Sequence, residues 1–227
     1  LRRGHRYATD DVLTAWTALR ARPDAGSLLD LGAGVGSVGL LTLRLLPADA
    51  RLTSVEVLEE SAALLRRTAR LNRVAERVDV RQGDLRDPAA LDGDERFDLI
   101  TANPPFLPQG SGWESSHPQR RAARFELHGD VFDYCMAAAT HLAEGGRFCF
   151  CHAASDSRPE RAVAAAGLRV LRRQAVHFRQ GREPRLALYV CGALGDRLAP
   201  APLTVRDAHG RRTSAYVEVL RALGMVA

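Results

Sequence analysis

Residues 27–36 read Ser-Leu-Leu-Asp-Leu-Gly-Ala-Gly-Val-Gly, an apolar run that leads directly into three closely spaced glycines. The run Ser27–Leu31 is typical of a buried strand, and the residues from Ser37 to Leu46 predict a helix. Glycines let the chain turn tightly and let a ligand approach the backbone. The helix behind them presents N–H groups without helical partners. The stretch therefore predicts a strand, a binding turn and a helix.

Alternating strands and helices continue along the rest of the chain. Further strands are predicted over 51–55, 77–82, 96–102, 147–152, 170–178 and 185–191, and further helices over 9–20, 59–72, 130–142, 160–166 and 214–223. Strands that alternate with helices favour a parallel sheet with right-handed crossovers. We therefore expect an α/β fold with a doubly wound, mostly parallel seven-stranded sheet, a C-terminal antiparallel hairpin and helices on both faces.

The chain has 227 residues, a length that suits one large α/β domain. We expect a single domain over 1–227. Within it, 1–26 would be a basic segment and a helix, 27–192 the ligand-binding sheet core, and 193–227 a C-terminal hairpin and helix.

The charge, the apolar runs and the cysteines of the chain indicate which kinds of protein it can be. The formal net charge is +5, the chain contains no lysine, and this mild basic balance is compatible with a polyanionic partner. No apolar run is long enough to span a bilayer, and no secretory signal is visible. The four cysteines are Cys135, Cys149, Cys151 and Cys191. They lack metal-ligand spacing and are typical of buried thiols in a reducing compartment, so we expect a cytoplasmic protein without a metal site. We also expect a monomer.

Acidic residues follow the predicted strands. Glu56 comes twenty residues after Gly36, where a carboxylate can accept hydrogen bonds from ribose hydroxyls, and Asp84 could accept one from an adenine amino group. The third glycine comes one residue too early for a dinucleotide fingerprint, and Asp30 disfavours phosphate but suits a cation. An adenosine that carries a positive sulfonium fits this pattern. The competing interpretation is a structural turn for the glycines and solvated surface for the acids.

The tetrapeptide Asn103-Pro104-Pro105-Phe106 follows the strand predicted over 96–102. Two prolines make this segment rigid and keep the residues before them out of helical geometry. The Asn103 side chain and the Pro104 carbonyl can then face one small polar group, with Phe106 as a flat surface beside them. Two acceptors and an aromatic ring suit a planar amino group, although Asn-Pro is also a common start of a simple turn.

The segment 107–125 lacks periodicity, and a loop of this length in a compact domain is usually functional or disordered. Trp113 is a candidate for stacking on a base, and Arg120, Arg121 and Arg124 are candidates for phosphate contacts. Arg6 lies in the basic N-terminal segment, which could extend the same surface. The alternatives are loop packing for the tryptophan and a solvated face for the arginines.

These motifs, in this order and spacing, resemble the class I S-adenosylmethionine-dependent methyltransferases. The chain is most similar to the bacterial tRNA1(Val) adenine-N6 methyltransferases. The resembling residues are Asp30-Leu-Gly-Ala-Gly-Val-Gly36, Glu56, Asp84 and Asn103-Pro-Pro-Phe106, with weaker matches at Gly4-x-Arg6-Tyr7, Asp10, Ala123–Glu126 and Leu203–Thr213. The resemblance implies a Rossmann-like fold, S-adenosylmethionine as cofactor with Asp10 near it, a catalytic Asn-Pro-Pro-Phe, and methylation of adenine N6 in tRNA.

Two residues depart from that family's pattern: Ala8 replaces a usual Ser or Thr, and Arg212 replaces a common aromatic residue. These departures affect the choice of substrate rather than the chemistry. Guanine-N2 methylation of ribosomal RNA and methylation of protein glutamine use similar tetrapeptides, and both stay open. From a different class, a non-catalytic module that binds cofactor or RNA could keep the same fold.

Overall fold

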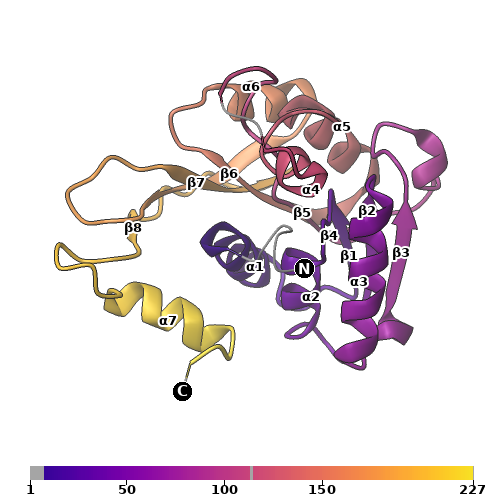
Figure 1. The fold of residues 1–227 in the computed structure, drawn as a ribbon, viewed down its shortest axis with the longest axis horizontal. Helices are drawn as coiled ribbons and strands as arrows, with labels where there is room; N and C mark the ends of the chain where they lie inside the picture. The colour runs from indigo at the N-terminus through magenta and orange to yellow at the C-terminus, as the bar shows by residue number, and fades with distance from the viewer. Residues whose placement is uncertain (1–7, 113–114, 227) are drawn as a thin grey trace.

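The strand, turn and helix expected around Gly32–Gly36 are confirmed in the computed structural model, which describes residues 8–112 and 115–226. Strand β1 covers Ser27–Leu31, and helix α2 begins at Ser37, directly after the glycines. Figure 1 shows helices on both sides of one twisted sheet.

In the described residues the sheet has eight strands in the order β3-β2-β1-β4-β5-β7-β6-β8. Strands β1 to β5 run parallel to one another, β7 runs antiparallel to both β5 and β6, and β8 runs parallel to β6. The strands after β1 are β2 (Arg51–Glu56), β3 (Val78–Gln82), β4 (Phe97–Ala102), β5 (Leu142–Ala153), β6 (Arg169–His177), β7 (Leu186–Gly192) and β8 (Leu203–Thr204).

The helices cover both faces of this sheet (Figure 1). Apolar residues of α1, α2 and α7 pack on one face, and those of α5 and α6 pack on the other. The α-helices are α1 (Thr9–Ala21), α2 (Ser37–Leu43), α3 (Glu59–Leu71), α4 (Pro118–Ala122), α5 (Val131–His141), α6 (Arg158–Ala165) and α7 (Ser214–Ala222), and the 3-10 turns are Ala75–Arg77 and Pro88–Ala90.

The expectation of seven strands is wrong by one. The additional strand, β8, is only two residues long, and it pairs Leu203 with Val176 and Thr204 with His177 of β6. Two residues are too short to show the alternation that reveals a strand in sequence. The C-terminal segment is therefore hydrogen-bonded into the sheet edge before the chain enters α7.

The central strands are buried on both faces. Leu29 and Leu31 belong to the core under α5 and α6, whereas Leu28 and Leu99 belong to the core under α1 and α2. Strands covered on both sides read as continuous apolar runs, which is why the run in β1 is visible from the sequence.

Parallel register brings the ends of three strands together. Leu31 at the end of β1 pairs with Val55 of β2 on one side and with Ala102 of β4 on the other. The residues that follow these strands therefore meet at one edge of the sheet, where open α/β sheets bind their ligands.

Candidate active site

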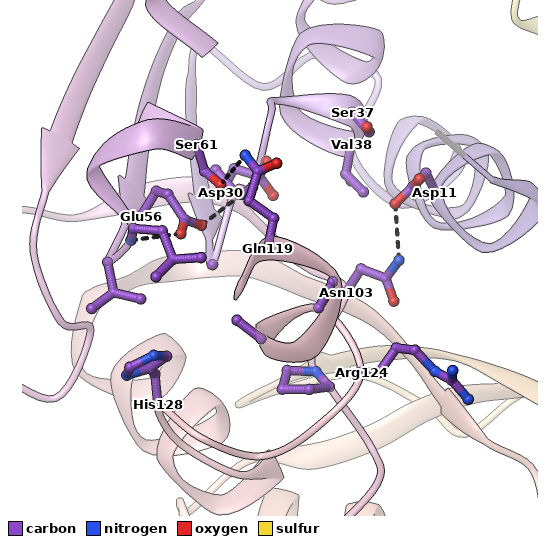
Figure 2. Close-up of a pocket in the computed structure, with 18 of the residues that line it drawn as sticks. Asp11, Asp30, Ser37, Val38, Glu56, Ser61, Asn103, Gln119, Arg124 and His128 are labelled. Atoms are coloured by element: carbon purple, nitrogen blue, oxygen red, sulfur yellow. Dashed lines mark hydrogen bonds between the residues drawn. The ribbon is translucent and has the colours of Figure 1, made fainter. Parts of the chain in front are cut away.

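A cavity of about 640 Å³ opens at this edge of the sheet. Its acidic residues come from α1 and the ends of β1 and β2, and its basic residues come from the segment after β4 and from the start of β7. Figure 2 shows Asp11, Asp30 and Glu56 on one side of the cavity and Arg124 and His128 on the other. We call the side with Asp11, Asp30 and Glu56 the acidic wall of the cavity, and the side with Arg124 and His128 its basic rim.

The glycine turn lines the acidic wall. Gly32 and Gly34 both have left-handed backbone geometry, with φ of 63° and 57°. A methyl group added at Gly34 would meet nothing within 4 Å, because that position faces the cavity. The backbone at Gly34 is therefore open to close approach by a ligand.

Glu56 ends β2 and is almost fully buried. One carboxylate oxygen accepts a hydrogen bond from the Gly34 N–H at 2.8 Å, and the other accepts one from the Leu58 N–H at 2.8 Å. A carboxylate has about four lone-pair sites, so two backbone hydrogen bonds do not exhaust its capacity as an acceptor. The backbone bonds hold the carboxylate rigidly at the cavity wall, as an acceptor for ligand hydroxyls requires.

Asp30 lies beneath the glycine turn and is 1% exposed. It accepts hydrogen bonds from the Thr101 hydroxyl at 2.8 Å and from the Gly39 N–H at 2.9 Å. The pKa of Asp30 is raised to about 7, mainly by burial and to a lesser degree by the charges of Asp11 and Glu56, against the lowering effect of these two hydrogen bonds. Near neutral pH this carboxyl group is therefore poised between its neutral and charged forms.

This titration predicts a pH-dependent preference for a cationic ligand. A sulfonium in the cavity stabilises the Asp30 carboxylate, so binding it at low pH requires loss of a proton. The ratio of affinities for S-adenosylmethionine over neutral S-adenosylhomocysteine should rise by up to about tenfold between about pH 6 and pH 8. Titration calorimetry at several pH values measures both constants, and a ratio that stays flat over this range contradicts the role assigned to Asp30.

Asn103 follows β4 and lines the cavity. Its amide nitrogen donates to Asp10 Oδ2 at 3.0 Å and to Asp11 Oδ1 at 2.9 Å. Asp11 in turn accepts a hydrogen bond from the Ala8 N–H, which holds it at the first turn of α1. Because carboxylates accept and do not donate, these contacts direct the NH2 group of Asn103 toward α1 and its carbonyl oxygen away from it (Figure 2).

The carbonyl oxygen of Asn103 has one weak internal donor. The buried Cys151 thiol donates to Asn103 Oδ1 at 3.0 Å. Burial and the nearby charge of Asp10 raise the pKa of this thiol well above its usual range, so it stays protonated and donates. A thiol is a weak donor, and the second lone pair of Oδ1 is left for a ligand.

Phe106 and Pro105 also line the cavity, whereas Pro104 is buried and does not line it. The Phe106 ring packs edge-on against His152 of β5, with ring centroids 5.6 Å apart. Burial lowers the pKa of His152 to about 4, so this imidazole is neutral at pH 7 and supports the phenyl ring as an uncharged neighbour.

Asp84, the acid predicted to contact adenine, is held by a neighbour. Its carboxylate accepts hydrogen bonds from the Arg86 guanidinium at 2.9 and 2.5 Å, and this pairing lowers its pKa. Gly83 and Leu85 line the cavity, but Asp84 between them does not. Asp84 can therefore accept a hydrogen bond from an adenine amino group only after its pair with Arg86 has rearranged.

Other predicted residues divide into three groups. Arg120 and Arg124 line the main cavity together with Asp10. Arg121 lies instead beside a smaller cavity on α4, and Arg6 and Trp113 fall outside the described residues.

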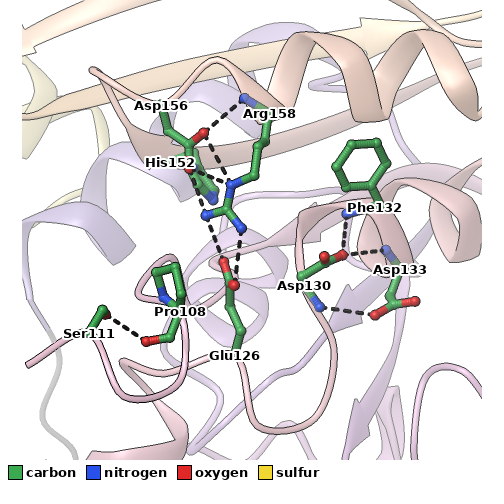
Figure 3. Close-up of polar contacts among 9 residues, drawn as sticks. All are labelled: Pro108, Ser111, Glu126, Asp130, Phe132, Asp133, His152, Asp156 and Arg158. Atoms are coloured by element: carbon green, nitrogen blue, oxygen red, sulfur yellow. Dashed lines mark hydrogen bonds and ion pairs between the residues drawn. The ribbon is translucent and has the colours of Figure 1, made fainter.

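The two ends of the segment 107–125, which carries these arginines, are hydrogen-bonded to each other. The Leu107 N–H donates to the Arg124 carbonyl, and the Glu126 N–H donates to the Leu107 carbonyl. Glu126 also pairs with Arg158 of α6 at 2.9 Å, and Arg158 pairs with Asp156 at 2.7 Å (Figure 3). Glu126 thus anchors the segment to α6, which is a structural reason for a glutamate at this point.

Sequence reasoning missed Asp11, Gln119 and Arg185, which all line the cavity. Gln119 is 3% exposed; its amide nitrogen donates to the Ser61 hydroxyl at 3.1 Å, and its carbonyl oxygen has no partner among the described residues. That buried oxygen at the cavity is a candidate acceptor for a ligand. The sequence does not indicate this role, because Gln119 on α4 is held by Ser61 on α3, which is 58 positions away.

Residues 8–112 and 115–226 contain no group of three or more His, Cys, Asp or Glu side chains that could hold a metal ion. Within the same ranges, no helix is both long and apolar enough to cross a membrane.

Comparison with known proteins shows which proteins the chain is similar to. The family model described as methyltransferase small domain matches residues 13–119. A predicted O-methyltransferase of Agrobacterium tumefaciens has a solved structure that matches with a TM-score of 0.66 and 22% identity, over 96% of this chain and 98% of that one. The chain is therefore similar to methyltransferases in its fold, and residues 13–119 are similar to a methyltransferase family model.

The chain is also similar to curated proteins that carry a more specific name. A tRNA1(Val) (adenine(37)-N6)-methyltransferase of Klebsiella pneumoniae is 34% identical over 149 residues, which cover 63% of this chain and 57% of that protein. A protein of the same name from Shewanella amazonensis is 29% identical over 220 residues, which cover 96% of this chain and 91% of that protein. The match to the first relative therefore spans little more than half of its length.

Proposed function

We propose that the protein transfers a methyl group from S-adenosylmethionine to the N6 amino group of an adenine in tRNA. The orientation of Asn103 is the observation that carries this proposal. Two carboxylates on α1 hold its amide nitrogen, so the carbonyl oxygen remains as an acceptor beside Phe106 in the cavity. An acceptor fixed in this way suits a planar amino group that has two hydrogens to donate.

The acidic wall fits the proposed cofactor. Gly34 leaves space for close approach, Glu56 offers a rigid carboxylate for the ribose hydroxyls, and Asp30 can counter a positive sulfur. S-adenosylmethionine supplies a methyl group on a positively charged sulfur when it is bound. The cavity of about 640 Å³ lies in the range of small-molecule sites.

The chain's own residues would act by positioning and by electrostatics. Asn103 Oδ1 and the Pro104 carbonyl would each accept one N–H of the amino group, while Phe106 stacks on the base. Both oxygens would also stabilise the positive charge that develops on the nitrogen, a preorganised electrostatic effect that requires no side-chain base. The neutral His152 behind Phe106 is in keeping with such a site.

A nucleic acid substrate is favoured by the basic rim and by the names of the relatives. Arg120 and Arg124 line the cavity opposite the acidic wall, where the phosphates of an extruded nucleotide would lie. Bases in RNA loops are easier to extrude than bases in duplexes. We propose a cytoplasmic enzyme that acts on tRNA for these reasons.

Methyl transfer to cellular pools tests the proposal. The protein is incubated with methyl-labelled S-adenosylmethionine and with total tRNA, ribosomal RNA or protein from a strain that lacks its gene, and labelled products are analysed as nucleosides by mass spectrometry. We expect N6-methyladenosine in tRNA. N2-methylguanosine would refute the adenine assignment, label in protein alone would refute the RNA assignment, and a protein that binds cofactor without labelling any pool would refute catalysis on them.

A further inference from the structure

Six arginines gather in two short segments beside the proposed active site. Residues 177–185 form the turn between β6 and β7, and residues 204–213 connect β8 to α7. The arginines are Arg179, Arg182, Arg185, Arg206, Arg211 and Arg212, and the only acids in the two segments are Glu183 and Asp207. The two segments thus carry a formal charge of +4, of the +5 of the whole chain.

The two segments lie side by side and form one surface. The Val205 N–H donates to the His177 carbonyl at 2.8 Å, and the Gln180 N–H donates to the Arg206 carbonyl at 2.8 Å. The Arg179 guanidinium donates to the Ala208 carbonyl at 3.2 Å. Figure 1 shows both segments projecting from the same end of the sheet, beyond β7 and β8. We call the six arginines on them the arginine surface.

The charges of the arginine surface are mostly not neutralised within the protein. All six side chains are exposed. Asp207 pairs with Arg211 at 3.0 Å, and Arg206 donates only to a backbone carbonyl. Among the described residues, no ion pair involves Arg182, Arg185 or Arg212. A concentration of exposed, unneutralised guanidinium groups is typical of a surface for phosphates.

Arg185 connects this surface to the active-site cavity. It lines the cavity together with Arg124 and Asn103. It immediately precedes β7, in which Ala187 pairs with His152, the residue that contacts Phe106. A polyanion that leaves the cavity past Arg185 would therefore pass directly onto the arginine surface.

We infer that the arginine surface binds the phosphates of the RNA strand that flanks the target nucleotide. This inference rests on the proposed function, because the target nucleotide defines where the strand begins. Phe178, which is 37% exposed beside Arg179, adds an aromatic ring on which an unpaired base can stack. RNA is favoured over other polyanions because the surface continues into a cavity built for a planar amine.

Binding measurements with charge-matched variants test the inference. The double variant Arg182→Gln/Arg212→Gln removes two arginines whose side chains make no hydrogen bond within the described residues. The control Arg67→Gln/Arg70→Gln removes two exposed arginines from α3, which packs against β2 and β3 at the other end of the sheet. Fluorescence anisotropy with a labelled tRNA transcript gives Kd at several salt concentrations, and calorimetry gives Kd for S-adenosylmethionine.

We expect the surface variant to raise Kd for tRNA about tenfold and to reduce the salt slope by about 1.4, as two lost contacts to single-stranded phosphates predict. The control should bind tRNA like the unchanged protein, and both variants should bind S-adenosylmethionine normally. Equal binding by the surface variant and the unchanged protein, or equal weakening in both variants, would overturn the inference.

Two further results distinguish RNA binding by the arginine surface from general polyanion binding and from the proposed methyl transfer. If the unchanged protein binds vesicles of anionic phospholipid as tightly as tRNA, and the surface variant loses both, the surface is a general polyanion site and the inference is wrong. If the surface variant loses tRNA binding while the unchanged protein methylates no RNA, the arginine surface stands and the proposed function fails.

Discussion

Replacing Asn103 with alanine is expected to lower kcat for methyl transfer by about a hundredfold to a thousandfold, the usual cost of losing one preorganised polar group at a reacting centre. Kd for S-adenosylmethionine should stay nearly unchanged, because the side chain is assigned to the amino group of the substrate. Single-turnover transfer from labelled cofactor measures the first quantity, and calorimetry measures the second.

The fold should tolerate this change. Asp11 keeps its hydrogen bond from the Ala8 N–H, and Cys151 loses only a weak thiol contact. Asn72→Ala is the matched control, since Asn72 is the only other asparagine in the chain and lies exposed at the end of α3. Normal turnover in Asn103→Ala would remove the acceptor role from the mechanism. An equal loss in Asn72→Ala would mean that the assay does not report on the active site.

The positions of Gly34, Glu56 and Asn103 could be predicted from the sequence because each lies at or just after the end of a strand. Strands β1 and β4 are largely apolar runs, and parallel register brings the ends of β1, β2 and β4 together. Local patterns and one rule of topology are therefore enough to predict where the cavity lies, but they do not predict which side chains point into it.

The residues that escaped prediction depend on contacts between distant segments. Asp11 contacts Asn103 across 92 positions of sequence, and nothing local marks one of two adjacent aspartates on α1 as the orienting one. Arg185 reaches the cavity only because β7 reverses direction beside β5. Asp84 shows the opposite error, since its position after β3 was predicted well but its pairing with Arg86 was not.

Gly32 and Gly34 are expected to respond to the same substitution in different ways, although their φ values differ by only a few degrees. An alanine at either position pays a left-handed backbone penalty of about 1–2 kcal/mol. At Gly32 the added methyl group would also collide with the Tyr134 phenol, which is buried in the core under α5. Overpacking of this kind costs about 1–3 kcal/mol more.

Gly32→Ala should therefore lower the free energy of unfolding by about 2–5 kcal/mol, enough to unfold a marginally stable domain. Gly34→Ala should lower it by only about 1–2 kcal/mol, because its methyl group points into open space. That space belongs to the cavity, so Gly34→Ala should instead weaken S-adenosylmethionine binding at least about tenfold. Urea unfolding and calorimetry measure the two effects.

A double-mutant cycle identifies the cause of the Gly32 effect. Tyr134→Leu removes the phenol that the new methyl group would meet, so in that background Gly32→Ala should cost no more than Gly34→Ala does in the unchanged protein. If Gly32→Ala costs the same in both backgrounds, the collision with Tyr134 is not the reason for glycine at this position. The backbone geometry of the turn would then be sufficient to explain it.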